Sequence, residues 1–409
     1  MTMLAEPPSA LPVPAPEPRD RPWPVPHAGM PPLDTAGDPL SAFEFWSMRR
    51  FYWPIALYAL WLMVRYRGIT LPTAANPSFP GGGLVGESKS AILDLACAAA
   101  PDHVAPFVAV DRPGHPDDAI GEALAAEAAM TAAGLGFPVV AKPDLGCRGA
   151  GVRLVRDPGE LAAYLEGFPA GARLVFQRHV AYEAEAGVFY VREPGGEGGR
   201  ILSLTLKYFP YVHGDGRSTL RELILADPRA GRVPHLYLPR HAARLDWIPE
   251  AGEPVRLAFA GSHSRGSIFR DGTHLVTPAM TERFDAIARA IPEFWFGRFD
   301  VRFADIARLQ AGEDFTILEV NGAGAEMTHV WDRSKTLRQA RRDLMEQYRL
   351  LFAIGRANRD RGHRGQGLRE FWRAWRREKA LTPEAAFRAV EGVNRRAKGG
   401  YAVVATVLG

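Results

Sequence analysis

Cysteine is nearly absent from this 409-residue sequence, which contains only Cys97 and Cys147. Two cysteines cannot build the disulfide framework of a secreted domain, and they do not have the paired spacing of a zinc site. The first residues also lack the basic-then-apolar order of a secretion signal. We therefore expect a protein of a reducing compartment, the cytoplasm. A hydrophobic fraction of 47% is enough for two or three packed lobes.

Lysine is scarce as well, because only six of the 50 Lys and Arg residues are Lys. A lysine kept against that bias can serve where a compact point charge is needed. Lys142 follows the strand-like run 137–141 and precedes the glycine-rich loop 143–152. The backbone of such a loop can close over phosphates, and a plain hairpin turn is the alternative.

The two best-known nucleotide motifs are missing. No Gly-Lys-Ser/Thr follows the glycine-rich loop, which excludes a Walker loop, and the Rossmann glycine order with a downstream helix does not occur. A nucleotide bound by this chain would need a different cradle.

Three oxygen ligands stand in two apolar, strand-like segments near residues 300 and 320. Residues two apart on a strand share a face, so Glu319 and Asn321 can bind one metal cluster while Asp300 reaches it from a neighbouring strand. Oxygen ligands without His or Cys suit magnesium held with nucleotide phosphates. Arg298 should project from the same face toward the bound anion. A single such carboxylate would more simply be solvated at a sheet edge.

The order of these parts resembles the ATP-grasp superfamily, and within it carboxylate–amine ligases of the D-alanine–D-alanine ligase and cyanophycin synthetase type. The resemblance covers about residues 137–332. It implies an α+β fold in which two lobes clamp ATP, with a reduced N-terminal pre-ATP-grasp region. It also implies ATP and Mg²⁺ as cofactors and a ligase that joins a small-molecule carboxylate to an amine through an acyl phosphate, releasing ADP and phosphate.

The resemblance assigns roles around the nucleotide. Lys142 would bind the α- and β-phosphates, the glycine loop would cover the β- and γ-phosphates, a hinge at residues 177–180 would read adenine, and Glu185 would accept from the ribose. The residues it assigns to the nucleotide are Lys142, Gly146, Arg148, Gly149, Gly151, Gln177, Arg178, His179, Val180 and Glu185.

The resemblance also assigns the chemistry. Arg298 would stabilise the acyl-phosphate and tetrahedral species, Lys207 would face the nucleotide, and the metal ligands would be Asp300, Glu319 and Asn321. In the Gly-Gly…Glu…Ser segment, Glu87 would take the substrate amine, Lys89 a carboxylate or phosphate, and Ser88 would cap the helix 91–100. A surface lysine at 207 and a plain loop at 87–89 remain open alternatives.

The sequence departs from the family pattern at two places. Gln177 stands where the hinge usually begins with an acidic residue. No Lys or Arg occurs between Arg112 and Lys142, where the family supplies a second phosphate-binding lysine. Arg112, Lys89 or Arg148 could take its place. If none does, the alternatives are a nucleotide-binding accessory protein with decayed catalysis or a kinase-like ATP-grasp enzyme.

Two aromatic segments flanked by arginine raise the question of a membrane. Residues 51–64 are uncharged, too short to cross a bilayer, and suit a helix at a membrane interface or a buried core helix equally well. Residues 356–409 carry 13 Lys or Arg against 5 Asp or Glu, so the remainder sums to −4. The stripe at 368–379 predicts a basic amphipathic helix that binds anionic lipid or docks on the body. We expect no nucleic-acid partner, and recruitment to the inner membrane face remains a hypothesis.

The chain is expected to divide into five parts: a Pro-rich, disordered or extended N-terminus at 1–40, a helical pre-ATP-grasp region at 41–110, a first lobe at 111–200, a second lobe with the metal site at 201–355, and a basic helical tail at 356–409.

Overall fold

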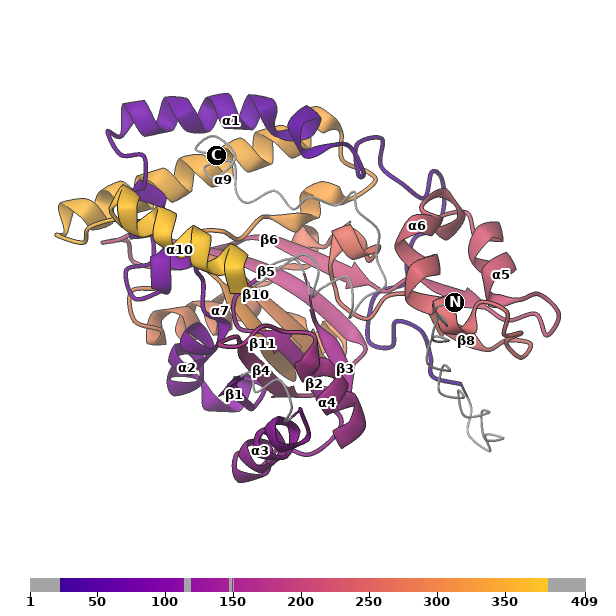
Figure 1. Ribbon diagram of the computed structural model, residues 1–409. Helices are drawn as coiled ribbons and strands as arrows, with labels where there is room; N and C mark the ends of the chain where they lie inside the picture. Colours follow the sequence, from indigo (N-terminus) through magenta and orange to yellow (C-terminus); the bar gives the residue numbers. More distant parts are fainter. Residues whose placement is uncertain (1–22, 114–118, 147–148, 150, 382–409) are drawn as a thin grey trace, which may run out of the picture.

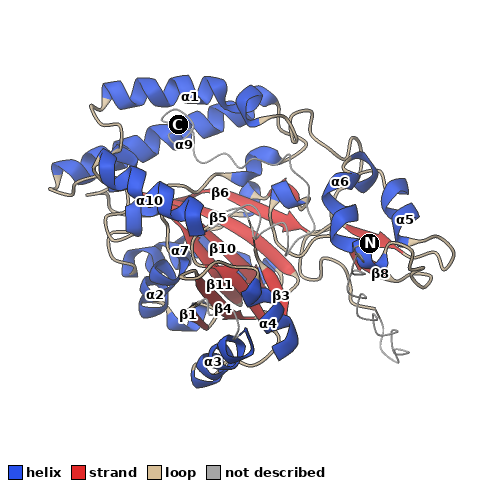
Figure 2. Ribbon diagram, in the orientation of Figure 1, coloured by secondary structure: helices blue, strands red, loops and turns tan. Residues whose placement is uncertain are grey.

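Two antiparallel sheets form the centre of the protein and helices surround them (Figures 1 and 2). The computed structural model describes residues 23–113, 119–146, 149 and 151–381. The strands are β1 (Phe107–Asp111), β2 (Val139–Pro143), β3 (Arg153–Val155), β4 (Arg173–Arg178), β5 (Ala184–Arg192), β6 (Gly199–Tyr208), β7 (Tyr211–His213), β8 (Pro254–Arg256), β9 (Ile268–Asp271), β10 (Phe296–Phe303) and β11 (Phe315–Asn321). The helices are α1 (Met48–Arg65), α2 (Lys89–Ala99), α3 (Ala119–Ala132), α4 (Pro158–Glu166), α5 (Leu220–Ala226), α6 (Pro234–Tyr237), α7 (Pro278–Ala290), α8 (Ile306–Gln310), α9 (Leu337–Asp360) and α10 (Leu368–Leu381).

The larger sheet has the strand order β11-β10-β5-β6-β9. Its second strand β10 alternates, and Phe299, Val301 and Phe303 enter a core that also contains Phe284 of α7. Because successive side chains on a strand point to opposite faces, the charged residues between these apolar ones gather on the other face. That face carries the candidate site.

The smaller sheet has the order β1-β4-β2-β3, and α3 and α4 pack on it around Tyr164 and Phe176. The chain leaves this sheet after Arg178 and enters the larger one at Ala184. The two sheets therefore divide near residue 180, between β4 and β5. The predicted lobe boundary at 200 falls within the β5–β6 hairpin of the larger sheet, and the division into lobes stays a prediction.

Helix α1 lies along the long helix α9 (Figure 1). Its buried face, including Phe51, Ile55 and Leu62, shares a core with Leu351 of α9. Arg341 and Arg359 of α9 donate to backbone carbonyls near the two ends of α1, Phe51 at 3.1 Å and Tyr66 at 2.8 Å. Among the residues described, no helix is both long and apolar enough to cross a membrane.

The part of the Pro-rich segment that is described, residues 23–40, is held against the body. The backbone nitrogen of Ile306 donates to the carbonyl of Gly29 at 2.9 Å, and the Tyr208 hydroxyl donates to the carbonyl of Pro31 at 3.0 Å. Leu40 joins the small core of α5 and α6. The sequence predicted disordered or extended chain here, and residues 23–40 form no helix or strand. Composition alone does not reveal that their backbone carbonyls bind the body.

Side chains cap several helices. Thr219 caps α5 in a reciprocal arrangement with Glu222. Ser88 caps α2 by accepting from the nitrogen of Ala91 at 3.2 Å. Helix α10 docks through Phe371, while Leu368 is 55% exposed, so the helix is partly packed and partly open to solvent.

Candidate functional site

The polar face of β10 brings the predicted metal ligands together by strand register. Arg298 pairs with Asn321 and Asp300 pairs with Glu319 across the β10–β11 ladder. On the other side, Asp300 lies opposite Gly187 of β5. A Cβ atom at Gly187 would lie 3.0 Å from the Cδ atom of Arg298 and 3.3 Å from Oδ1 of Asp300. Glycine at 187 therefore leaves the space that these two side chains use.

Asp300 is the centre of the ion-pair network. Arg298 donates to it through two nitrogens, Nε at 2.7 Å and Nη2 at 2.9 Å, and Nζ of Lys207 lies 3.0 Å away. Burial alone would raise the pKa of Asp300, but the charges of Arg298 and Lys207 outweigh it and hold this pKa well below its ordinary value. Asp300 is therefore ionised, as a carboxylate must be to bind a metal.

Arg298 keeps capacity for a ligand. Its Nη1 atom donates to the carbonyl of Glu326 at 3.0 Å, in addition to the two bonds to Asp300. A guanidinium has five N–H groups, so among the described residues two remain for a bound anion. Burial lowers the pKa of Arg298, and the Asp300 carboxylate raises it by more, so the side chain stays charged.

A β-bulge joins the two sheets at Lys142. The β10–β11 register shifts after Asp300, which leaves Leu318 without a partner in the ladder. Nζ of Lys142 donates to the freed carbonyl of Leu318 and to Oε1 of Gln177, both at 3.0 Å. Burial lowers the pKa of Lys142 to about 8, although Glu319 acts to raise it. Gln177 thus holds the lysine through its side chain, and its predicted hinge role, which uses backbone groups, stays a prediction.

Glu185 lies between two cations. Its Oε1 atom is 3.2 Å from Nζ of Lys207, and its Oε2 atom is 3.6 Å from Nε of Arg302. That Nε atom is buried and has no hydrogen-bond partner in the described part of the chain. Gly261 packs so closely on Glu185 that a Cβ atom there would clash with the carboxylate.

Arg302 was not predicted as a site residue, although the two-residue repeat of a strand places it on this face. Arg298, Asp300 and Arg302 are each two residues apart on β10, so all three share the polar face. Gly187 was not predicted either, because no spacing rule exists for it.

Lys89 contacts both the glycine loop and a predicted metal ligand. Its Nζ atom is 3.8 Å from Oε1 of Glu319, and it donates to the carbonyl of Gly146 in the glycine loop. Arg112, the other described candidate for the second phosphate-binding cation, is bound to Glu122 at 2.8 Å. Arg148 lies outside the described residues. Of the two candidates that can be placed, only Lys89 reaches both the glycine loop and a predicted metal ligand.

Glu87 faces the end of β11. Its Oε1 atom accepts from the backbone nitrogen of Gly322 at 3.0 Å. Burial raises the pKa of Glu87 to about 7, and Glu319 and Glu378 add to this effect while the Gly322 bond and Lys89 oppose it. Glu378 belongs to α10 and accepts from the nitrogen of Gly86 at 3.0 Å. Helix α10 of the basic tail therefore packs against the predicted substrate segment. The sequence did not indicate this contact.

A cavity of about 430 Å³ borders this segment. Ser88 and Asp144 line one side of it, and Arg373 and Arg377 of α10 line another. Ser88 donates to Oδ2 of Asp144 at 2.8 Å, which fixes that carboxylate. The arginines give the cavity a positive side.

The backbone at the three glycines of the glycine loop is of the kind that favours glycine. Gly146, Gly149 and Gly151 all have positive φ, at 131°, 69° and 72°. A Cβ atom on Gly149 would lie 3.1 Å from that of Ala260, so the loop approaches the segment that covers Glu185.

The predicted adenine hinge is partly occupied by protein contacts. The carbonyl of Val180 accepts from Nη1 of Arg302 at 2.6 Å. Arg178 is exposed and donates to the carbonyl of Gly134 at 3.5 Å. Burial lowers the pKa of His179, so this ring is neutral at physiological pH. The side chain of Gln177 accepts from Lys142. Of the four predicted hinge residues, only Val180 has a backbone carbonyl that accepts from a described side chain.

Cations and carboxylates alternate along this face. The cations are Lys89, Lys142, Lys207, Arg298 and Arg302, and the carboxylates are Glu185, Asp300 and Glu319, with Glu87, Asp144 and Glu326 close by. Within the described ranges no group of three His, Cys, Asp or Glu side chains could hold a metal. A magnesium site here therefore depends on the amide oxygen of Asn321, a ligand type that magnesium accepts.

Comparison with known proteins gives structural neighbours only. No family model matches the chain, and no curated protein matches it. Similar solved structures include a bifunctional glutathione synthetase from Pasteurella multocida, with 16% identity, TM-score 0.32, and 64% of this chain and 35% of that chain covered. VanG D-Ala:D-Ser ligase from Enterococcus faecalis has 14% identity, TM-score 0.36, and covers 64% of this chain and 62% of that chain. D-cycloserine synthetase DcsG has 15% identity, TM-score 0.33, and covers 64% and 70%.

These neighbours are ATP-grasp ligases, the superfamily that the sequence motifs resemble. The chain spans about a third of the first neighbour and less than two thirds of the second. TM-scores below 0.5 carry no argument about the site. Its interpretation rests on the side-chain geometry described above.

Proposed function

We propose that this protein is an ATP-dependent ligase that joins a carboxylate to an amine through an acyl phosphate. The observation that carries the proposal is the polar face of β10, where Arg298, Asp300 and Glu319 meet Lys142 from the smaller sheet. Asp300 is held ionised, and Arg298 keeps two N–H donors for a ligand. The resemblance of the motif order to carboxylate–amine ligases supports the same reaction.

In the proposed reaction, an oxygen of the substrate carboxylate attacks the γ-phosphorus of ATP, and the bond from that phosphorus to the β–γ bridging oxygen breaks. ADP leaves with that oxygen. The amine then attacks the acyl carbon, inorganic phosphate leaves, and the nitrogen loses a proton.

The residues divide this work by position. Lys142 and Lys89 bind phosphate oxygens beside β11, because the ammonium group of Lys142 lies against Leu318 and that of Lys89 lies between Glu319 and the glycine loop. Arg298 directs its remaining N–H groups at the transferring phosphoryl group and the developing oxyanion. Glu87, with a pKa of about 7, can accept a proton from an attacking amine near neutral pH.

Asp300, Glu319 and Asn321 are the residues that would hold magnesium. Their oxygen donors fit that ion, and Arg298 and Lys207 balance the Asp300 charge in its absence. Bound there, magnesium would neutralise charge on the phosphate oxygens.

The main alternative is an accessory protein that binds nucleotide without turnover, because the second lysine is absent from its usual place. The position of Lys89 favours the ligase, since its ammonium group lies 3.8 Å from Glu319 and contacts the glycine loop. A kinase-like reaction would release ADP with one co-substrate, whereas the ligase requires both.

Glu319→Gln tests the proposal, because it changes one ligand at nearly constant volume. We expect ADP release to be lost while the thermal unfolding temperature stays unchanged. Glu313→Gln is the matched control, since Glu313 lies just before β11 and is half exposed, paired with Arg308 at 2.8 Å. Full turnover in Glu319→Gln would remove the metal assignment.

A further inference from the structure

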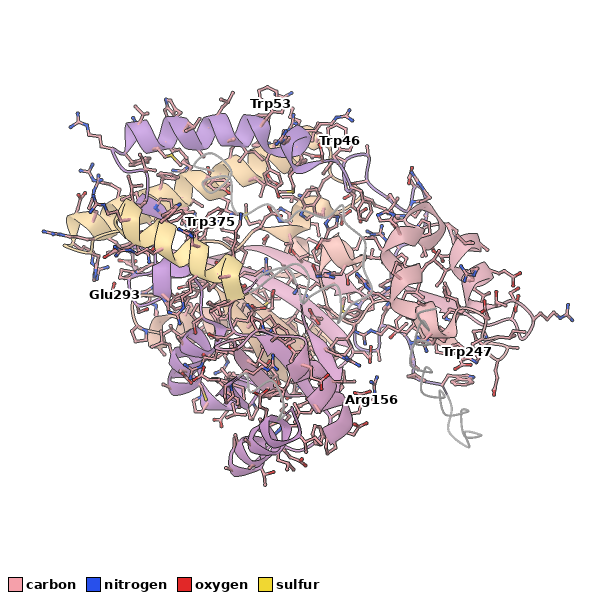
Figure 3. All side chains as sticks on the ribbon, in the orientation of Figure 1. Trp46, Trp53, Arg156, Trp247, Glu293 and Trp375 are labelled. Carbon is pink, nitrogen blue, oxygen red and sulfur yellow. The ribbon has the colours of Figure 1, made fainter. Side chains whose placement is uncertain are left out.

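The outer face of α1 is apolar although it faces solvent. Trp53, Leu57, Leu60, Trp61 and Val64 are 58%, 58%, 38%, 52% and 78% exposed. Their spacing of four, three, one and three residues places them on one side of the helix. The opposite side is buried against α9. In Figure 3, Trp53 points away from the body of the protein.

Arginines flank this face at both ends of the helix. Arg49 and Arg50 precede it and Arg65 and Arg67 follow it, and all four are exposed. No Asp or Glu occurs between Glu44 and Glu87 in the sequence. The guanidinium of Arg65 lies 5.6 Å from the ring of Trp61. The surface therefore combines an apolar centre and aromatic rings with arginine at both ends.

We propose that the outer face of α1 docks on an anionic lipid bilayer and lies in its interface. Tryptophan and aliphatic side chains enter the boundary between headgroups and acyl chains, while arginines bind the phosphates of the headgroups. Contacts from α9 to both ends of α1 hold the helix in place, so docking requires no unfolding.

The charge pattern argues against a second copy of the chain as the occupant. In a two-fold pairing of α1 on α1, either helix direction would bring arginine clusters from the two copies together. Like charges at an interface oppose association, whereas an anionic bilayer complements every cation on this surface. The proposal does not depend on the ligase function, because no residue of the outer face belongs to the candidate site.

Co-sedimentation of the full chain with vesicles tests the proposal. The vesicles are phosphatidylcholine alone or phosphatidylcholine mixed with phosphatidylglycerol. We expect binding to the mixed vesicles that falls as salt is raised. Replacing both Trp53 and Trp61 by Ser should weaken binding by at least about tenfold. Arg49→Gln and Arg50→Gln should each weaken it about fivefold.

Trp372→Ser is the matched control, because Trp372 of α10 is exposed to the same degree, 53%, on a helix that is also basic. We expect it to leave binding unchanged. An equal loss in this variant would overturn the assignment to α1. Absence of binding at low salt would overturn the lipid proposal, as would a dimer in sedimentation equilibrium that the Trp53 and Trp61 changes dissociate. Unchanged unfolding temperatures would show that the variants are folded.

Discussion

Binding of ATP should take up a proton at alkaline pH, because Lys142 is then partly neutral in the ligand-free protein. Burial lowers its pKa to about 8. About half of the amine is therefore neutral at pH 8 and about a tenth at pH 7. Phosphate oxygens beside the Nζ atom favour the charged form and raise this pKa again. The expected uptake is about half a proton per ATP at pH 8 and about a tenth at pH 7.

Titration calorimetry without co-substrates measures this uptake. The observed binding enthalpy is compared in two buffers of different ionisation enthalpy, and the slope gives the number of protons. The phosphates of ATP are ionised at pH 8, since their last pKa is near about 6, so they contribute little. Lys142→Met should abolish the buffer dependence and weaken ATP binding by about tenfold to a hundredfold, the worth of a charged hydrogen bond.

The lowered pKa of Lys142 also determines how the stability of the ligand-free protein changes with pH. Between about pH 8 and 10.5 the unfolded chain holds the lysine proton and the folded protein does not. The free energy of unfolding of the ligand-free protein should therefore rise with pH across this window.

Equal binding enthalpies in the two buffers at pH 8 would refute the placement of Lys142 against the phosphates.

Two further predictions concern paired arginines. Arg298→Lys should preserve ATP affinity and lower kcat by about 10²–10³, because an ammonium group cannot donate to Asp300 and to an oxyanion in the same geometry; an unchanged kcat would refute its role. Arg229→Met should destabilise the protein by about 3–5 kcal/mol in urea at pH 7, since it leaves the buried Glu44 carboxylate without its main partner. Burial raises the pKa of Glu44, but His263 and Arg229 lower it to about 2, so this stabilisation is present above pH 4.5 and is lost as the pH falls toward 2. A cost below about 1 kcal/mol would contradict that account.

Strand periodicity was sufficient to predict which of these side chains lie on one face of the sheet. Glu319 and Asn321 share a face, and Asp300 lies opposite Glu319, because the two-residue repeat of a strand is a local property of the sequence. The bulge at Leu318 was not predictable. It depends on how two strands pair, and it supplies the carbonyl that holds Lys142.

The other parts of the site could not be predicted, because they depend on contacts between segments that are far apart in the sequence. The sequence left Arg112, Lys89 and Arg148 as equal candidates for the second phosphate-binding cation, because their distances from the glycine loop depend on tertiary packing. The contact between Glu378 of α10 and the nitrogen of Gly86 joins positions 292 residues apart, and no spacing rule reaches so far. The helix 51–64 was predicted as either buried or interfacial, and the structure explains why: one of its faces is buried and the other is exposed.

A paired ADP-release screen tests whether this face performs ligation. Purified protein is incubated with ATP, magnesium and combinations of amino acids and other carboxylates with amines. We expect at least one pair for which ADP appears only when both partners are present, with equimolar phosphate, and for which Glu319→Gln releases none. Tight ATP binding with no turnover for any pair, or ADP release that needs only one partner, would contradict the ligase proposal.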